Sequence, residues 1–286
     1  MRKILFLVLV PFLMNAQNAA EEAGFLLDKK KYEQAETVIE NHVLDNPNDI
    51  TSIELLGDAY AYQEKWDEAI VQYEKLIDLN PNNAEFQYKY GGAMGMKALE
   101  VNKVSALFMI DDVEDAFLKA IELDKDHINA RWALVEYYVQ LPGIIGGSVN
   151  KSLKFANELE AISKVDGYLA KGYVYEYDDE PELAEKYYKM AIEIGGSLTC
   201  YEKLTTFYEK QKQPEHAIQN IEASQQNNSH LIHLSTDFVF DGESGPYKEE
   251  DEPNPLSYYG ESKYEAEKLL QASAIKWSIA RTIIVY

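Results

Sequence analysis

The sequence is poor in cysteine and in basic residues, and each shortage excludes a class of protein. The single cysteine, Cys200, permits no intramolecular disulfide and no cysteine cage for a metal, so we expect a small buried side chain at the start of a helix. Lysine and arginine number 27 against 49 aspartate and glutamate residues, and the formal net charge is -22 at pH 7. Because this charge repels phosphate backbones and anionic membranes, nucleic acid is not the expected partner.

Long apolar runs are also missing, except at the N-terminus. There, "MRKILFLVLVPFLMNAQ" has a basic start, an apolar stretch from Ile4 to Met14, and small or polar residues after it. This order is that of a secretory signal peptide, and a run of about 11 residues is too short to span a bilayer. We expect residues 1–16 to be removed, leaving an exported periplasmic or extracellular protein without a membrane segment. A membrane-anchored first helix is the alternative.

A period of about 34 residues fills the middle of the chain. It is clearest in "ITSIELLGDAYAYQEKWDEAIVQYEKLIDLNPNN", which carries Leu56, Gly57, Tyr60, Ala69, Tyr73 and Pro81 at the spacing of paired antiparallel helices. Gly57 and Ala69 are small where two helices cross closely. Tyr60 and Tyr73 are expected to fill gaps between hairpins.

The same frame continues in both directions from this unit and predicts about six hairpins over residues 17–228. The unit that begins at Tyr90 and Gly91 carries about 10 extra residues before Phe117. A divergent hairpin follows, with "PGIIGGS" between its helices. This segment has neither a preceding strand nor the spacing of a phosphate loop, so we interpret it as a connection that breaks a helix.

Residues 17–228 resemble tetratricopeptide-repeat (TPR) proteins. The resemblance implies a mainly α fold, a right-handed α-solenoid, whose concave groove binds a protein or peptide segment. The many tyrosines are then shared between the hairpin cores and the groove.

The periodicity changes after "QQNNS". The segments "HLIHLSTDFVF" and "WSIARTIIVY" read as strands, and Tyr258 to Ala272 between them reads as a helix. Residues 230–286 resemble a fragment of dTDP-4-dehydrorhamnose reductase, an extended short-chain dehydrogenase/reductase of Rossmann type. The matching pattern is Ser-Thr-Asp-aromatic-Val-Phe-x-Gly, an acidic loop, Pro-Leu, and Tyr-Gly-x-Ser-Lys.

The resemblance assigns roles to four residues. Tyr259 would donate a proton to the substrate carbonyl as hydride arrives from NADP or NAD. Lys263 would lower the pKa of Tyr259 and hold the nicotinamide ribose, so both residues would also bind cofactor. Thr236 would hydrogen-bond the reacting oxygen, and Asp237 would lie near the sugar substrate.

The nucleotide-binding half of such an enzyme is missing from the sequence. Reductases of this kind begin with a strand, a Gly-x-x-Gly-x-x-Gly turn and a helix, whereas the preceding 200 or so residues here are helical repeat. We therefore place a boundary at residue 229, interpret 229–286 as a truncated reductase-like segment, and expect it to be inactive and to bind no cofactor. No metal site is predicted, because His230 and His233 have no third ligand.

Three functions follow from this organisation. The preferred one is an exported TPR scaffold for protein–protein interaction with an incomplete reductase-like tail. The alternative is an NAD(P)-dependent sugar-nucleotide oxidoreductase whose cofactor half is supplied in trans, and a structural role in envelope assembly is the third. Gene fusion, deletion and assembly error are all compatible with the junction.

Overall fold

The computed structural model describes residues 19–225, 231–243, 245–248, 251–272 and 277–282. The predicted signal peptide, residues 1–16, lies outside the described residues, and so does most of the predicted junction. Within the described part, none of the helices combines the length and apolar character needed to cross a membrane.

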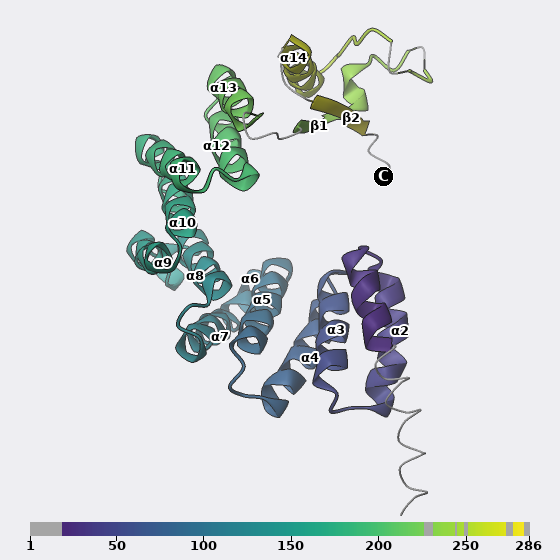
Figure 1. Ribbon diagram of the computed structural model, residues 1–286, viewed down its shortest axis with the longest axis vertical. Coiled ribbons are helices and arrows are strands. Elements are labelled where there is room, and N and C mark those ends of the chain that lie inside the picture. Colours follow the sequence, from purple (N-terminus) through teal and green to yellow (C-terminus); the bar gives the residue numbers. More distant parts are fainter. Residues whose placement is uncertain (1–18, 226–230, 244, 249–250, 273–276, 283–286) are drawn as a thin grey trace, which may run out of the picture. The chain divides into compact units, whose positions relative to one another are not determined.

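Helices make up nearly all of residues 19–225 (Figure 1). Residues 19–28 form the first, and the rest are α2 (Tyr32–Asp45), α3 (Ile50–Ala61), α4 (Trp66–Leu79), α5 (Ala84–Glu100), α6 (Lys103–Leu107), α7 (Ile110–Leu123), α8 (Ile128–Gln140), α9 (Val149–Ile162), α10 (Lys164–Tyr177), α11 (Pro181–Gly195), α12 (Leu198–Lys210) and α13 (Pro214–Gln225). They pair as hairpins: α3 with α4, α5 with α7, α8 with α9, α10 with α11, and α12 with α13, preceded by a first hairpin in which Leu26 of 19–28 shares a core cluster with Ala35 of α2. The predicted helical-repeat fold is confirmed.

In the hairpins α3–α4 and α10–α11, a glycine on the first helix packs against an aromatic ring on the second helix. A methyl group added at Gly57 would lie 2.6 Å from the Tyr73 ring, and one at Gly172 would lie 2.5 Å from the Tyr188 ring. Both pairs are sixteen positions apart in the sequence. Tyr73 therefore fills the interior of its own hairpin, where it is buried, and the expectation that it fills a gap between hairpins is corrected.

The extra residues of the third hairpin form a lengthened α5 and the short helix α6. Gly91 contacts the Phe117 ring as Gly57 contacts Tyr73, but the pair is 26 positions apart instead of sixteen. The insertion of about 10 residues predicted from the repeat frame is thus confirmed, and it lies between α5 and α7.

The "PGIIGGS" segment connects α8 to α9, as predicted. It holds a single 3₁₀ turn, η1 (Gly143–Ile145), and Gly146 after it has a positive φ of 107°. Gly147 comes so close to the carbonyl of Leu141 that a methyl group there would lie 1.7 Å from that oxygen. The glycines therefore serve a tight connection between two helices.

The chain divides between Ile162 and Ser163 into two compact units, which we describe separately. The first contains the helices up to α9, and the second contains α10 to α13 and the C-terminal segment. Cys200, on α12, is fully buried as expected.

The C-terminal segment is a small strand-helix-strand unit. Strands β1 (Leu231–Thr236) and β2 (Trp277–Thr282) pair in parallel, with Leu231 opposite Trp277 and Thr236 opposite Thr282. The 3₁₀ turn η2 (Asp237–Val239) follows β1, and helix α14 (Tyr258–Ala272) packs on both β1 and η2. The predicted β-α-β segment after the repeats is confirmed.

Candidate functional site

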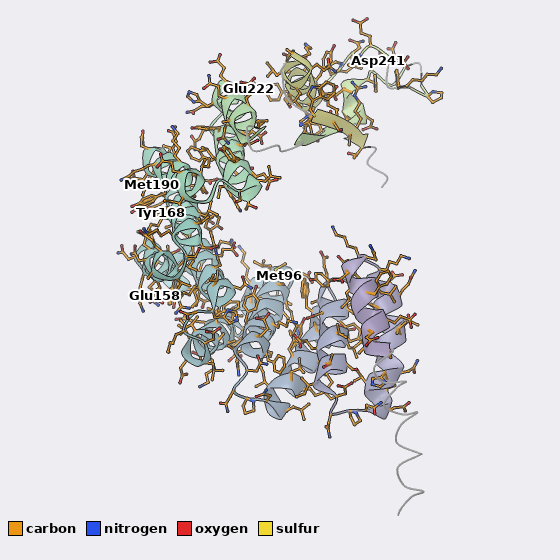
Figure 2. The ribbon with its side chains drawn as sticks, viewed as in Figure 1. Met96, Glu158, Tyr168, Met190, Glu222 and Asp241 are labelled. Carbon is orange, nitrogen blue, oxygen red and sulfur yellow. The ribbon has the colours of Figure 1, made fainter. Side chains whose placement is uncertain are left out.

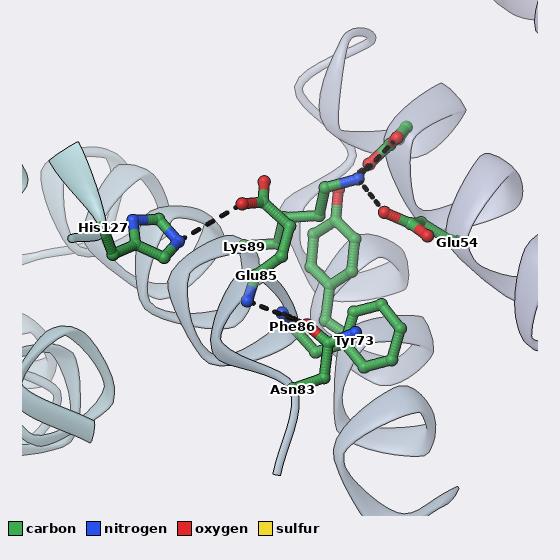
Figure 3. Close-up of polar contacts among 8 residues, drawn as sticks. Glu54, Tyr73, Asn83, Glu85, Phe86, Lys89 and His127 are labelled. Atoms are coloured by element: carbon green, nitrogen blue, oxygen red, sulfur yellow. Dashed lines mark hydrogen bonds and ion pairs between the residues drawn. The ribbon is translucent and has the colours of Figure 1, made fainter. Parts of the chain in front are cut away.

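A polar cluster joins neighbouring hairpins along their first helices, α3 and α5. The Lys89 ammonium on α5 donates to Glu54 Oε1 at 2.6 Å and to both oxygens of Asp58 at 2.8 Å. The Tyr73 hydroxyl donates to Asp58 Oδ1 at 2.9 Å. Figure 3 shows the Lys89 ammonium between the Glu54 carboxylate and the end of the Tyr73 ring. One hairpin is thereby tied to the next by charge-assisted hydrogen bonds.

The surroundings raise the pKa of two groups in this cluster, Tyr73 and Lys89. Burial and the Asp58 carboxylate raise the pKa of Tyr73, so its hydroxyl stays protonated and acts as a donor. Burial alone would lower the pKa of Lys89, but Asp58 and Glu54 outweigh it and raise that pKa. The cluster therefore connects the two hairpins through a protonated tyrosine and a charged lysine.

The first turn of α5 carries a second set of contacts, toward α8 (Figure 3). Asn83 caps α5 by accepting from the backbone nitrogens of Glu85 and Phe86. His127 caps α8, since its Nδ1 accepts from the Ala130 nitrogen at 3.1 Å, and its Nε2 lies 3.2 Å from Glu85 Oε2. Helices α3, α5 and α8 therefore form one continuous framework within the first unit.

Exposed apolar side chains recur at one position of the first helices. The fifth residue after each closely packed glycine is Tyr62 after Gly57, Met96 after Gly91 and Tyr177 after Gly172. We call Tyr62, Met96 and Tyr177 the plus-five residues; their exposed fractions are 60%, 45% and 56%. Met96 is labelled in Figure 2. Their constant distance from the packed glycine is the signal in the sequence that could have identified them.

The four reductase-like residues are placed around η2 and the start of α14. Thr236, at the end of β1, is buried; its hydroxyl accepts from the Phe238 nitrogen at 3.3 Å and donates to Asp237 Oδ1 at 3.1 Å. Asp237 opens η2 and is half-buried. The hydroxyl of Thr236 thus caps η2.

Tyr259 and Lys263 lie one helical turn apart on α14, as the motif predicts. The Lys263 ammonium is 6.0 Å from the centre of the Tyr259 ring, and that ring meets Phe238 edge to face. Tyr259 is half exposed, whereas its neighbour Gly260 is buried against η2. A methyl group at Gly260 would lie 2.2 Å from the Phe238 carbonyl oxygen, so only glycine allows α14 to begin this close to η2.

A charged pair holds α14 to β2. The fully buried Glu267 accepts from Arg281 Nε at 3.0 Å and from Nη2 at 2.6 Å, in a two-pronged arrangement. Burial by itself would raise the pKa of Glu267, but the Arg281 hydrogen bonds prevail and lower it. The pKa of His233 on β1 is lowered by burial and then by the nearby Lys263.

The acidic loop before α14 is fastened at Asp241, which Figure 2 labels. Its carboxylate accepts from the Tyr247 hydroxyl, from the Glu243 nitrogen at 3.0 Å and from Asn254 Nδ2 at 3.0 Å. These hydrogen bonds lower the pKa of Asp241 to about 2. Across the described residues, no group of three or more histidine, cysteine or acidic side chains is placed to hold a metal ion.

Comparison with known protein families separates the two parts of the chain. Residues 57–97 match the family model "TPR repeat", and residues 210–286 match "RmlD substrate binding domain". The helical part is a tetratricopeptide-repeat structure, and the C-terminal segment is related to dTDP-4-dehydrorhamnose reductase. The second match begins at the end of α12, so it includes α13, which also completes the last hairpin.

Curated relatives match the C-terminal segment. It is 52% identical over 62 residues to dTDP-4-dehydrorhamnose reductase of Aggregatibacter actinomycetemcomitans, which is 21% of this chain and 21% of the relative. It is also 45% identical over 56 residues to methionine adenosyltransferase 2 subunit beta of Bos taurus, covering 20% of this chain and 17% of the relative. The chain thus spans about a fifth of the length of these relatives.

Solved structures match the helical part. A thermophilic TPR protein of Thermus thermophilus superimposes with a TM-score of 0.56 and 14% identity, over 67% of this chain and 98% of that one. A tetratricopeptide repeat protein of Parabacteroides merdae gives a TM-score of 0.54 and 14% identity, over 77% and 82%. At these identities the likeness concerns the fold.

Proposed function

We propose that this protein is an exported scaffold that binds a protein or peptide segment through its TPR hairpins and carries a reductase-like tail without catalytic activity. The observation that supports binding is the recurrence of exposed side chains at the plus-five residues. The first helices that carry two of them, α3 and α5, are held together by the hydrogen bonds of Lys89. Exposed aromatic and methionine side chains are enriched in protein interfaces, and tyrosine is a common anchor there. The signal-peptide pattern of residues 1–16 supports export.

The groove proposal is tested by site-specific crosslinking in the native host. A photoreactive phenylalanine derivative replaces Tyr62, Met96 or Tyr177 in turn, and Leu44 serves as the control because it is equally apolar and is 73% exposed on α2. We expect the same crosslinked partner from two or more plus-five positions and none from Leu44. Equal crosslinking from Leu44, or different products from Tyr62 and Met96 of the first unit, would contradict the binding proposal.

A second function, NAD(P)-dependent reduction of a sugar nucleotide, is favoured by one observation. Tyr259 and Lys263 stand one turn apart on α14 with the ammonium 6.0 Å from the ring centre, as proton donation by the tyrosine would need. This function is less well supported than the scaffold function, because the sequence lacks the glycine-rich turn that would hold the pyrophosphate of the cofactor. A partner chain would have to supply it.

A further inference from the structure

The insertion in the third hairpin presents an apolar surface that the TPR repeat frame does not account for. Leu99 at the end of α5 and Val104, Leu107 and Phe108 on or beside α6 are exposed to 72%, 64%, 49% and 81%. We call these four residues the α6 platform. Leu107 and Phe108 follow Val104 by about one helical turn, so α6 directs apolar side chains to one side.

Two polar residues near the end of α5, Lys97 and Glu100, contact α4. Glu100 Oε1 accepts from Trp66 Nε1 at 2.6 Å, and the Lys97 ammonium donates to Asp67 on α4. Asn102 caps α6 by accepting from the Val104 and Ser105 nitrogens. The insertion is thus held against α4 while its apolar side chains face outward, an arrangement that lowers the ordering cost of binding.

Acidic groups lie next to the platform. Asp111 and Asp112 are exposed in the first turn of α7, directly after Phe108 and Met109. A hollow of about 320 Å³ between α5 and α7 is lined by Asp112 and Asp115 among others. The one basic side chain that lines this hollow is Lys119, and its ammonium donates to Glu122 at 2.9 Å. The lining of the hollow is therefore acidic overall.

We propose that the α6 platform binds an amphipathic helical segment of another protein, with leucine-like side chains on one face and lysine or arginine beside them. The apolar face would cover the platform while the basic row meets Asp111, Asp112 and Asp115. An amphipathic helix sets these two kinds of side chain next to each other at the required spacing. A second copy of this chain fits poorly, because two copies with a charge of -22 each repel.

The proposal rests on the scaffold function but concerns a different surface from the plus-five residues. It is tested with the full chain by fluorescence polarisation of a labelled amphipathic helix of about four turns made of leucine and lysine. Two further probes have the same leucine pattern with glutamate, and the same leucine–lysine composition without a single apolar face. We expect the first probe to bind at least tenfold more tightly than either of the others.

Substitutions then locate the binding surface. Leu107→Ser with Phe108→Ser should weaken the first probe at least tenfold, and Asp111→Asn with Asp112→Asn about threefold with a smaller effect of salt. Leu44→Ser, at an equally exposed leucine on α2, should stay within twofold of the unsubstituted chain. Val104→Ser replaces the double variant if that variant shows an altered circular dichroism spectrum.

Three results would overturn the proposal: equal loss in the Leu44 variant, equally tight binding of the glutamate probe, or a dimer in sedimentation that the platform substitutions dissociate. This test is independent of the proposed binding at the plus-five residues. Tyr62→Ser should leave probe binding intact, and the platform substitutions should leave crosslinking from Tyr62 intact. Failure of one proposal is therefore distinguishable from failure of the other.

Discussion

At the scale of single residues, the hairpins depend on contacts between small and aromatic side chains. The Tyr73 ring lies against Gly57, while its hydroxyl is fixed by Asp58, which also accepts from Lys89 of the next hairpin. The fifth hairpin repeats the arrangement with Gly172, Tyr188, Glu176 and Lys210. Because the ring is held at both ends, it has little freedom to move aside for a larger neighbour.

Gly57→Ala should lower the free energy of unfolding of the helical part by about 1 kcal/mol. Overpacking costs about 1–3 kcal/mol, and the better helix propensity of alanine returns up to about 1 kcal/mol. Gly92→Ala is the matched control, because a methyl group at Gly92 meets nothing within 4 Å. That control should gain about 0.5–1 kcal/mol. Urea unfolding followed by circular dichroism measures both, and a loss of equal size at both positions would contradict the packing argument.

At the scale of secondary-structure elements, the C-terminal unit is organised by α14. Gly260 lets its first turn approach η2, and Glu267 joins its last turns to Arg281 on β2. Tyr259 and Lys263 lie close to the first of these attachments on the same helix. Their placement therefore depends on a glycine and an ion pair that have no part in the chemistry of the motif.

Glu267→Gln should destabilise the packing of α14 on β2 by about 2–3 kcal/mol, because the Arg281 guanidinium loses the charge of its buried partner. We expect amide exchange across residues 258–272 to become at least tenfold faster. Glu265→Gln, at an exposed residue that pairs with Lys268 on the surface, is the control and should change exchange little. Unchanged exchange in the Glu267 variant would show that the pair does not hold the helix.

The same pair predicts a dependence on acid. The folded pKa of Glu267 lies below its ordinary value of 4.5, so the stability that the pair contributes is complete above about pH 4.5 and is lost as the pH falls through the folded pKa. Exchange of α14 amides, corrected for the intrinsic effect of pH, should therefore accelerate below about pH 4 in the unsubstituted protein and much less in the Glu267→Gln variant. An equal acceleration in both proteins would contradict this assignment.

At the scale of the whole molecule, a repeat protein and a reductase-like segment share one chain. Positioning of two reactants supplies about 7–11 kcal/mol toward a reaction barrier. The α14 motif offers only Tyr259 and Lys263 to such positioning, and the sequence offers no glycine-rich turn for a nicotinamide dinucleotide. The local geometry of one helix therefore does not by itself establish activity.

The isolated protein should bind neither NADH nor NADPH measurably in calorimetry, and should not reduce dTDP-4-dehydrorhamnose. An intact reductase serves as the positive control, and Tyr259→Phe as the internal one. Micromolar cofactor binding together with turnover that this substitution abolishes would overturn the scaffold proposal. It would also require a nucleotide site elsewhere on the chain.

The repeat fold, the place of the insertion and the strand-helix-strand tail follow from the sequence alone. Periodic small and aromatic residues encode helix crossings locally, and the Tyr-x-x-x-Lys spacing sets two side chains on one helical face whatever surrounds them. Which tyrosines are buried and which are exposed depends instead on tertiary packing, because Tyr73 and Tyr62 differ in what packs against them and not in residue type. The same holds for the α6 platform, which is positioned by contacts of the end of α5 with α4, and for the Glu267–Arg281 pair, which forms only when α14 packs on β2.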